Sequence, residues 1–237
     1  MYKRQGYGYA RNSGVSSWSD QHVVKYNSSG TNQWQRCIGD YYTGKQGWCM
    51  DVDSSGNYYP CGYVNDGGYQ ILVGKFTSSH SRTWQKRIYG ATSGKTSNAQ
   101  GGIVVDDSSG SVHIVGDTSQ SATGSRDILI VKLDSSGNIS WQRLIGIASR
   151  SLYGKDVAID NSGNVYIIGT GPVDYQGYPV YPYTSTMDAI ILAKYDSSGN
   201  LQWKRFMGAK FWGGYTDVDQ GQSIEVDPTG KNLYIAG

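Results

Sequence analysis

Residues 194–205 read Lys-Tyr-Asp-Ser-Ser-Gly-Asn-Leu-Gln-Trp-Lys-Arg, and related copies begin at Lys25, Lys75 and Lys132. In every copy the lysine precedes a tryptophan by nine positions. The tryptophans that mark the four copies are Trp34, Trp84, Trp141 and Trp203. Their spacings of 50, 57 and 62 residues reveal an internal repeat, and such a repeat decides the architecture before any single motif does.

A second repeated unit alternates with the first. It reads Asp-Val-Asp-Ser-Ser-Gly-Asn-Tyr-Tyr-Pro-Cys-Gly from Asp51, and its relatives begin at Val105, Ala158 and Glu225. Both units centre on Asp-Ser-Ser-Gly-Asn or a variant of it, in which Asp and Ser bond the local backbone and Gly accepts a positive φ. Short apolar or alternating runs flank these turns, so each unit predicts a β-hairpin.

Each full period therefore carries four strands. In one period we expect them at Val157–Asp160, Val165–Ile168, Ala189–Lys194 and Leu201–Phe206. Four-stranded units that recur roughly every 50 to 60 residues are typical of a β-propeller. A β-solenoid is the alternative, but its coils are usually shorter. The predicted fold is an all-β β-propeller of four-stranded antiparallel blades, with about four blades in this chain.

The composition agrees with an all-β chain and excludes several classes of function. The chain holds 33 Gly and 20 Tyr, and Glu225 is the only glutamate among 19 acidic residues. A net charge of +2 gives no electrostatic footprint for nucleic acid. No apolar run is long enough to span a bilayer. The three cysteines form no C-x-x-C pair, and the repeat places Cys61 at a small apolar core position.

The repeat resembles a known family. Its pattern is Asp-x-x-Gly-Asn-x-Tyr-x-x-Gly, then a variable loop, then a strand that ends Lys-Tyr-Asp-x-x-Gly-x-x-x-Trp. This pattern resembles the bacterial β-propeller repeat family SBBP, and it is similar to Trp-Gln-Arg repeat proteins of marine phage virions and surfaces. The resemblance covers about Tyr7 to Gly237. It implies the fold and brings no catalytic residue, metal or cofactor, because these families carry no catalytic motif to transfer.

The repeats also predict how the chain is divided. We expect three full blades between two partial ones, and the first five residues resemble a translated sequencing adapter. The expected boundaries are 1–5 for a non-native leader, 6–39 for a partial blade, 47–90, 101–146 and 155–208 for full blades, and 221–237 for a partial blade. This division predicts a metagenomic fragment, cut from a longer propeller.

Several motifs resemble known catalytic or ligand-binding motifs but lack a required residue or spacing. Gly90-Ala-Thr-Ser-Gly-Lys-Thr resembles a P-loop, but it has three residues between its glycines where four are needed. The stretch from Asp51 resembles half of a calcium loop, but Gly62 stands where a bidentate Glu is due. The histidines lie in different repeats and are interpreted as tolerated surface or edge residues: His22, His80 and His113. We therefore expect no catalytic residue and no metal site.

The candidate binding residues lie where the repeat breaks. In a meandering blade all the Ser-Ser-Gly turns lie on one face of the ring, and the long connections share the other, here called the variable-loop face. Its longest loops are Gly171–Met187 and Ala209–Gly221. Rigid aromatic rings on such loops suit ligand binding. The candidate ligand-binding residues are Tyr175, Tyr178, Tyr181, Tyr183, Phe211, Trp212 and Tyr215. The alternative is that these rings pack on one another, and the four repeated tryptophans are interpreted as blade-to-blade packing residues.

These observations favour a non-catalytic structural and recognition module. We expect it on a virion or on a bacterial surface, hence extracellular or virion-associated, where it binds polysaccharide or another surface or virion protein. We expect no nucleic-acid partner and no membrane span. One alternative is a propeller enzyme, either quinone-dependent dehydrogenase-like or polysaccharide-active. The other is an intracellular protein-interaction scaffold.

Overall fold

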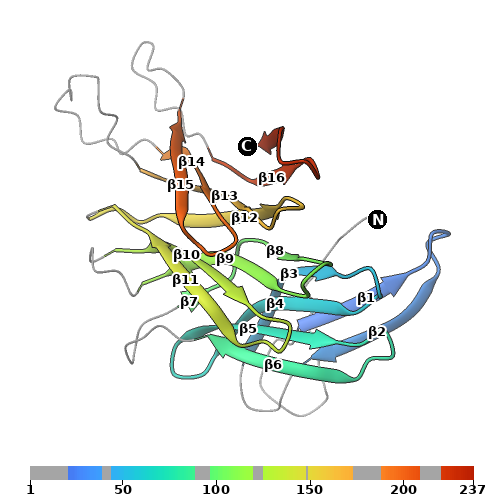
Figure 1. Cartoon of the computed structure of the whole chain (residues 1–237). Coiled ribbons are helices and arrows are strands. Elements are labelled where there is room, and N and C mark those ends of the chain that lie inside the picture. The colour runs from blue at the N-terminus through green and yellow to red at the C-terminus, as the bar shows by residue number, and fades with distance from the viewer. Residues whose placement is uncertain are drawn as a thin grey trace, which may run out of the picture.

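The computed structural model of the chain describes residues 21–38, 44–88, 97–119, 125–147, 149–172, 188–208 and 220–237. These residues form 17 β-strands in five antiparallel sheets. No helix occurs in these ranges, and therefore none with the length and hydropathy of a membrane span. The sheets follow one another through the molecule in chain order, from the blue N-terminal hairpin to the red C-terminal one (Figure 1).

The strands of each sheet are consecutive in the chain. The first sheet holds β1 (Gln21–Tyr26) and β2 (Asn32–Ile38). The second holds β3 (Gly44–Val52), β4 (Tyr58–Asn65), β5 (Tyr69–Phe76) and β6 (Arg82–Ile88). The third holds β7 (Ser97–Asn98), β8 (Ile103–Val105), β9 (Val112–Thr118), β10 (Asp127–Leu133) and β11 (Ile139–Ile145). The fourth holds β12 (Tyr153–Ile159), β13 (Val165–Pro172), β14 (Asp188–Tyr195) and β15 (Leu201–Met207). The fifth holds β16 (Ser223–Val226) and β17 (Leu233–Ala236).

The predicted fold class is confirmed. The second and fourth sheets are four-stranded antiparallel meanders, which is the form of a propeller blade. The innermost strands β3, β8, β12 and β16 lie next to one another in succession. In the part of the chain that the structure describes, no strand of the first sheet pairs with a strand of the fifth.

The hairpin turns owe their shape to the aspartate and glycine of the repeat. In the turn between β10 and β11, Oδ1 of Asp134 accepts hydrogen bonds from the backbone N–H groups of Ser136 (2.9 Å) and Asn138 (2.8 Å). Gly137 in this turn has a φ of +79°, a conformation that a side chain disfavours. The turns at Asp53, Asp160 and Asp196 repeat the arrangement. Where His80 replaces the glycine, its φ is +71°.

The first strand of the third sheet is broken, which the sequence pattern did not predict. β7 and β8 both pair with β9, and residues 99–102 between them belong to neither strand. The first strands of the second and fourth sheets shift register at the same point, between Gly47 and Cys49 and between Gly154 and Asp156. A bulge or break at this point bends the inner strand of each blade.

Apolar cores fill the spaces between consecutive sheets. The largest clusters join the second sheet to the third and the third to the fourth. Because the central sheets are covered on both faces, β9 is buried along its whole length. His113 on β9 is 0% exposed, so its interpretation as a surface or edge residue is wrong. Cys61 is fully buried, as its place in the repeat predicts.

Candidate functional site

The seven aromatic candidates lie outside the described residues: Tyr175, Tyr178, Tyr181, Tyr183, Phe211, Trp212 and Tyr215. The structure does describe the residues at the bases of their two loops. At the first loop Pro172 pairs with Asp188 across β13 and β14. At the base of the second loop, the N–H of Gly221 donates a hydrogen bond of 2.9 Å to the hydroxyl of Thr170, within β13. The ends of the two loops therefore lie together at one end of the fourth sheet.

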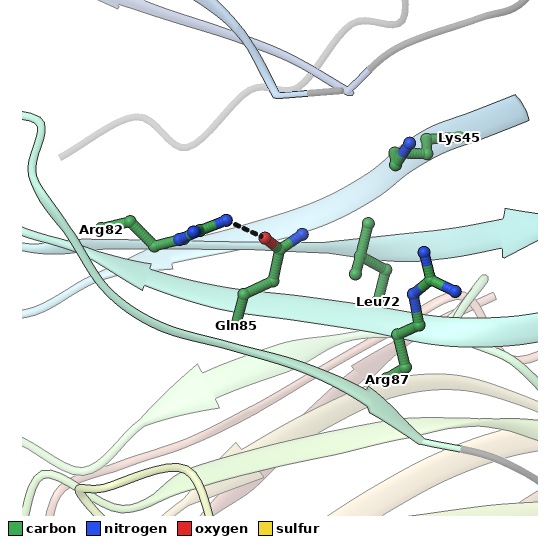
Figure 2. A pocket seen from close by; sticks show the side chains of 5 residues that line it. All are labelled: Lys45, Leu72, Arg82, Gln85 and Arg87. Carbon is green, nitrogen blue, oxygen red and sulfur yellow. Dashed lines mark hydrogen bonds between the residues drawn. The ribbon is translucent and has the colours of Figure 1, made fainter. Parts of the chain in front are cut away.

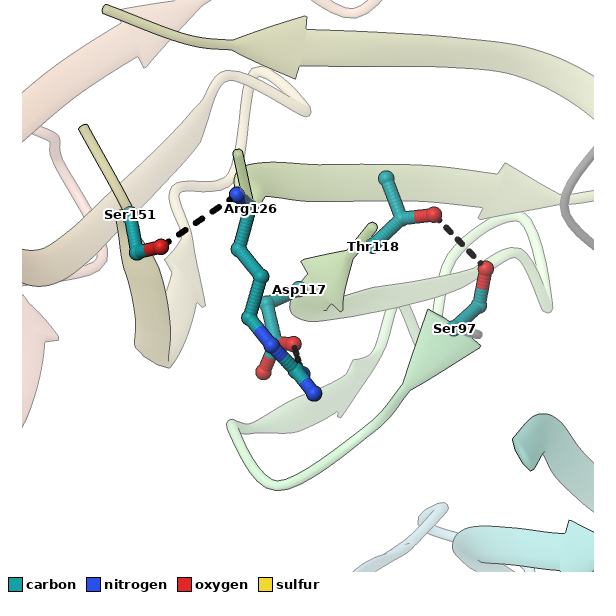
Figure 3. Close-up of polar contacts among 5 residues, drawn as sticks. All are labelled: Ser97, Asp117, Thr118, Arg126 and Ser151. Carbon is teal, nitrogen blue, oxygen red and sulfur yellow. Dashed lines mark hydrogen bonds and ion pairs between the residues drawn. The ribbon is translucent and has the colours of Figure 1, made fainter. Parts of the chain in front are cut away.

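Buried polar side chains gather at the same end of the neighbouring third sheet (Figure 3). The guanidinium of Arg126 forms an ion pair with Asp117, whose side chain is only 2% exposed. The hydroxyl of Ser97 donates to that of Thr118 at 3.0 Å, which ties β7 to the end of β9. The N–H of Leu152 donates to the carbonyl of Arg126 at 2.8 Å. The loop end of the third sheet is thus fixed to the start of the fourth by hydrogen bonds.

Two features of its surroundings act on the pKa of Asp117. Burial raises the pKa of its carboxyl above the ordinary value, and the ion pair with Arg126 opposes that effect. Since a buried carboxylate needs a hydrogen-bonded partner, Arg126 serves as the counter-charge of Asp117. Sequence reasoning missed this pair, because the two residues flank a connection whose length gives no hint of which ends meet.

A basic groove lies between the first and second sheets. One hollow of about 340 Å³ is lined by Lys45, Leu72, Arg82, Gln85 and Arg87, and a second of about 420 Å³ adds Arg36, Cys37, Ile38 and Phe76. The two hollows share Lys45, Arg82 and Gln85 as a common wall. Figure 2 shows the five side chains of the first hollow around it. We call Arg36, Lys45, Arg82, Gln85 and Arg87 the basic groove.

The polar contacts of the groove hold its side chains in place. The guanidinium of Arg82 donates to the side-chain oxygen of Gln85 at 3.0 Å, the bond drawn in Figure 2. Arg87 pairs with Asp66 at 2.6 Å, at a partly exposed position. Arg36 donates to the backbone carbonyl of His80 and lies over the ring of Phe76, 5.6 Å from its centre. Four cationic side chains thus face this space. Among the described residues that line it none is acidic, and Asp66, the acidic partner of Arg87, is not one of the lining residues.

Sequence reasoning missed the basic groove, although the repeat contains a signal for it. Arg87 pairs with Leu72, and the residues in the same place in the third and fourth sheets are Leu144 and Phe206. Arg87 thus departs from the repeat, because the other full blades have apolar residues at this position. Such a departure is visible in the sequence once the copies are aligned.

The repeated tryptophans lie at the interfaces between sheets. Nε1 of Trp84 donates to the carbonyl of Ser135 at 3.0 Å, and Nε1 of Trp141 donates to that of Ser197 at 3.2 Å. Trp34 packs edge-on against His80 with ring centres 4.3 Å apart. Trp203 packs against Tyr166 of its own sheet. The first three indoles thus reach a turn of the following sheet.

Groups of three or more His, Cys, Asp or Glu that could hold a metal ion do not occur among the described residues. The polar groups described above are the ion pair of Asp117 with Arg126 and the cations of the basic groove. This arrangement can bind anionic or hydroxylated ligands.

Comparison with known proteins gives one family match. The family model of SBBP, the beta-propeller repeat, matches residues 141–178. A comparison with curated proteins finds no match. Among solved structures the chain is similar to the gluconolactonase XC5397 from Xanthomonas campestris, with 12% identity, 91% of this chain and 75% of that chain covered, and a TM-score of 0.34. At that TM-score the likeness says nothing about the activity of this chain. The matched stretch begins in β11 of the third sheet and extends past the end of β13 in the fourth, so it covers one part of the repeat array.

Proposed function

We propose that the chain is a non-catalytic recognition module that binds polysaccharide through its variable-loop face. The observation that carries the proposal is the hydrogen bond between Gly221 and Thr170, which holds the bases of the two aromatic-rich loops together. Two loops anchored at one place can present their rings to a single ligand. Rigid aromatic side chains offer contact area at a low cost in conformational entropy, and sugar rings stack on them.

The scaffold beneath these loops suits recognition. Both faces of the fourth sheet are covered by apolar cores, so its strands hold the loop bases rigidly. Binding sites commonly sit on loops that a rigid scaffold positions. A place on a virion or a bacterial surface, with a polysaccharide or another surface protein as partner, is part of the same proposal.

A glycan array tests the proposal with the full chain. We expect the wild-type protein to retain a set of polysaccharides, and the triple variant Tyr178→Ala/Tyr183→Ala/Trp212→Ala to lose them. The matched control is Tyr26→Ala/Tyr234→Ala, which removes two tyrosines that are 59% and 64% exposed on the first and fifth sheets. Equal binding by both variants contradicts the loop site. Release of products from a retained glycan contradicts the non-catalytic role and favours the polysaccharide-active alternative.

A further inference from the structure

We propose that the basic groove between the first and second sheets is a second binding site, which takes an acidic polysaccharide through its carboxylate or sulfate groups. This site shares no residue with the variable-loop face, so its test is independent of the test of the function proposed above. The groove residues are Arg36, Lys45, Arg82, Gln85 and Arg87.

The comparison between blades shows that the fold does not require these cations. Arg82 pairs with Phe76, and in the fourth sheet Leu201 pairs with Tyr195 at the same register. Arg87 has Phe206 as its counterpart there. Lys45 corresponds to Leu152 of the fourth sheet. Each lies two residues before a glycine that pairs with a glycine of the next strand, and the two glycine pairs are Gly47 with Gly62 and Gly154 with Gly169.

The fourth sheet therefore has apolar residues at all three positions. Leu152 is fully buried in the core between the third and fourth sheets. Leu201 and Phe206 are 52% and 36% exposed, so the fold tolerates apolar side chains at these exposed positions as well. Three basic residues that stand where the fourth sheet has apolar ones, and that all line the first hollow, indicate a local requirement for positive charge.

The dimensions of the groove favour an extended ligand. Arg82 and Arg87 stand at opposite ends of β6, and five residues of extended strand span about 15 Å. Cationic residues spaced along a strand in this way can contact successive acidic groups of one sugar chain. Guanidinium groups bind carboxylate and sulfate through paired charge-assisted hydrogen bonds. The amide of Gln85, between the two arginines, can donate to and accept from sugar hydroxyls.

Acidic polysaccharide fits the groove better than nucleic acid does. Single strands of nucleic acid stack their bases on exposed aromatic rings. Among the described residues that line the groove, the aromatic one is Phe76, and it is only 3% exposed. The whole chain has a net charge of +2, without the broad basic surface of nucleic-acid-binding domains. A short row of cations inside a hollow matches spaced acidic groups on a sugar chain.

Biolayer interferometry with immobilised polygalacturonate tests the proposal on the full chain. Dextran serves as the neutral polymer, and duplex DNA as the other polyanion. The groove variant Arg82→Ile/Arg87→Leu carries the residues of the third sheet at these places, Ile139 and Leu144. A second variant, Arg82→Gln/Arg87→Gln, removes the charges and keeps polar side chains. The control Arg205→Leu/Lys231→Leu also removes two positive charges, but from the fourth and fifth sheets and not from the groove.

We expect wild type and control to bind polygalacturonate, and to bind it less tightly as salt is raised. Both groove variants should bind about tenfold more weakly or worse, because two charge-assisted contacts are lost. Unchanged melting temperatures show that the variants are folded. No binding by the wild type, equal losses in groove variants and control, or binding to duplex DNA as tight as to polygalacturonate overturns the proposal. The aromatic loop variant should bind polygalacturonate like the wild type, which separates this site from the variable-loop face.

Discussion

Nε1 of Trp84 donates a hydrogen bond of 3.0 Å to the carbonyl oxygen of Ser135, across the interface between the second and third sheets. The indole also packs on the turn that contains Ser135. A Cβ atom built on Gly137 of that turn would lie 2.7 Å from the ring of Trp84. The Trp of one repeat and the Ser-Ser-Gly turn of the next therefore fit one another, which explains why both recur together.

The fit between Trp84 and Gly137 predicts a large effect of adding one methyl group. Gly137→Ala places a side chain at a φ of +79° and against the indole ring. We expect about 1 kcal/mol of backbone strain together with about 1–3 kcal/mol of overpacking. Urea unfolding, followed by tryptophan fluorescence, measures the change in stability.

Gly30 provides a matched control for that experiment. Its φ is +76°, but a Cβ atom there would meet nothing within 4 Å. Gly30→Ala should therefore cost only the backbone strain, about 1 kcal/mol. If the two substitutions destabilise the protein equally, the indole does not constrain Gly137.

The ion pair between Arg126 and Asp117, at the loop end of the third sheet, should contribute more to stability than an exposed ion pair does. Arg126→Met leaves Asp117 buried without its ion-pair partner. Breaking a pair of which both partners are buried costs about 3–5 kcal/mol, and we expect a loss of about 2–3 kcal/mol here, because the side chain of Arg126 is 34% exposed. Arg87→Met removes one partner of the exposed pair with Asp66, whose side chains are 31% and 53% exposed, and should cost less than about 1 kcal/mol. Thermal unfolding of both variants checks the ranking, and similar melting temperatures would show that the Arg126 pair is no more important than a surface pair.

The sequence predicts the blades well because local chemistry determines them. The aspartate and glycine of most turns fix the hairpins. The constant distance from lysine to tryptophan fixes the register, so that Lys132 pairs with Trp141 as Lys75 pairs with Trp84. The predicted strand Val157–Asp160 is longer in the structure, where β12 begins at Tyr153. Its first part precedes a bulge and carries mixed residues, which no alternating pattern reveals.

The polar sites were less predictable because they depend on contacts between blades. The charge of Asp117 is balanced by Arg126 only once β9 and β10 have paired in register. The groove residues come from β2, β3 and β6, which meet only when the first two sheets pack together. His113 was misinterpreted because its alternating neighbours suggest a half-exposed strand, whereas the third sheet is covered on both faces.

The three cysteines should react with thiol reagents at different rates, because they differ in exposure. Cys37 is exposed, whereas Cys61 is fully buried. Cys49 stands opposite Cys61 across β3 and β4, and a hydrogen bond with that thiol, then burial, raise the pKa of Cys49 well above its ordinary value. Because the thiolate is the reactive form, we expect one fast reaction with an aromatic disulfide reagent at mildly alkaline pH.

The fast thiol should be Cys37. Cys37→Ser should remove the fast phase, and unfolding in urea should then expose the two remaining thiols. A fast phase that persists in Cys37→Ser would show that the β3–β4 pair opens readily in the native protein.

His113 predicts how stability changes with pH. Burial, then the nearby charge of Lys132, lower the pKa of this imidazole to about 4, while Asp106 acts in the opposite direction. The unfolded chain therefore binds a proton near pH 6.5 that the folded chain does not bind until about pH 4. The contribution of His113 to stability is fully present above pH 6.5 and is lost as the pH falls from about 6.5 to about 4. Over that window we expect a loss of about 3 kcal/mol.

The repeat itself supplies the variant that isolates this effect. Tyr59 and Tyr166 occupy the place of His113 in the second and fourth sheets, and each donates a 3.0 Å hydrogen bond to a turn aspartate. His113→Tyr should therefore keep the fold while removing the titrating group. The turn aspartates, including Asp227 with a pKa lowered to about 2, still lose their stabilising effect at lower pH in both proteins. Urea midpoints at pH 7 and pH 5 should differ more for wild type than for His113→Tyr, and equal differences would show that His113 is protonated in the folded protein.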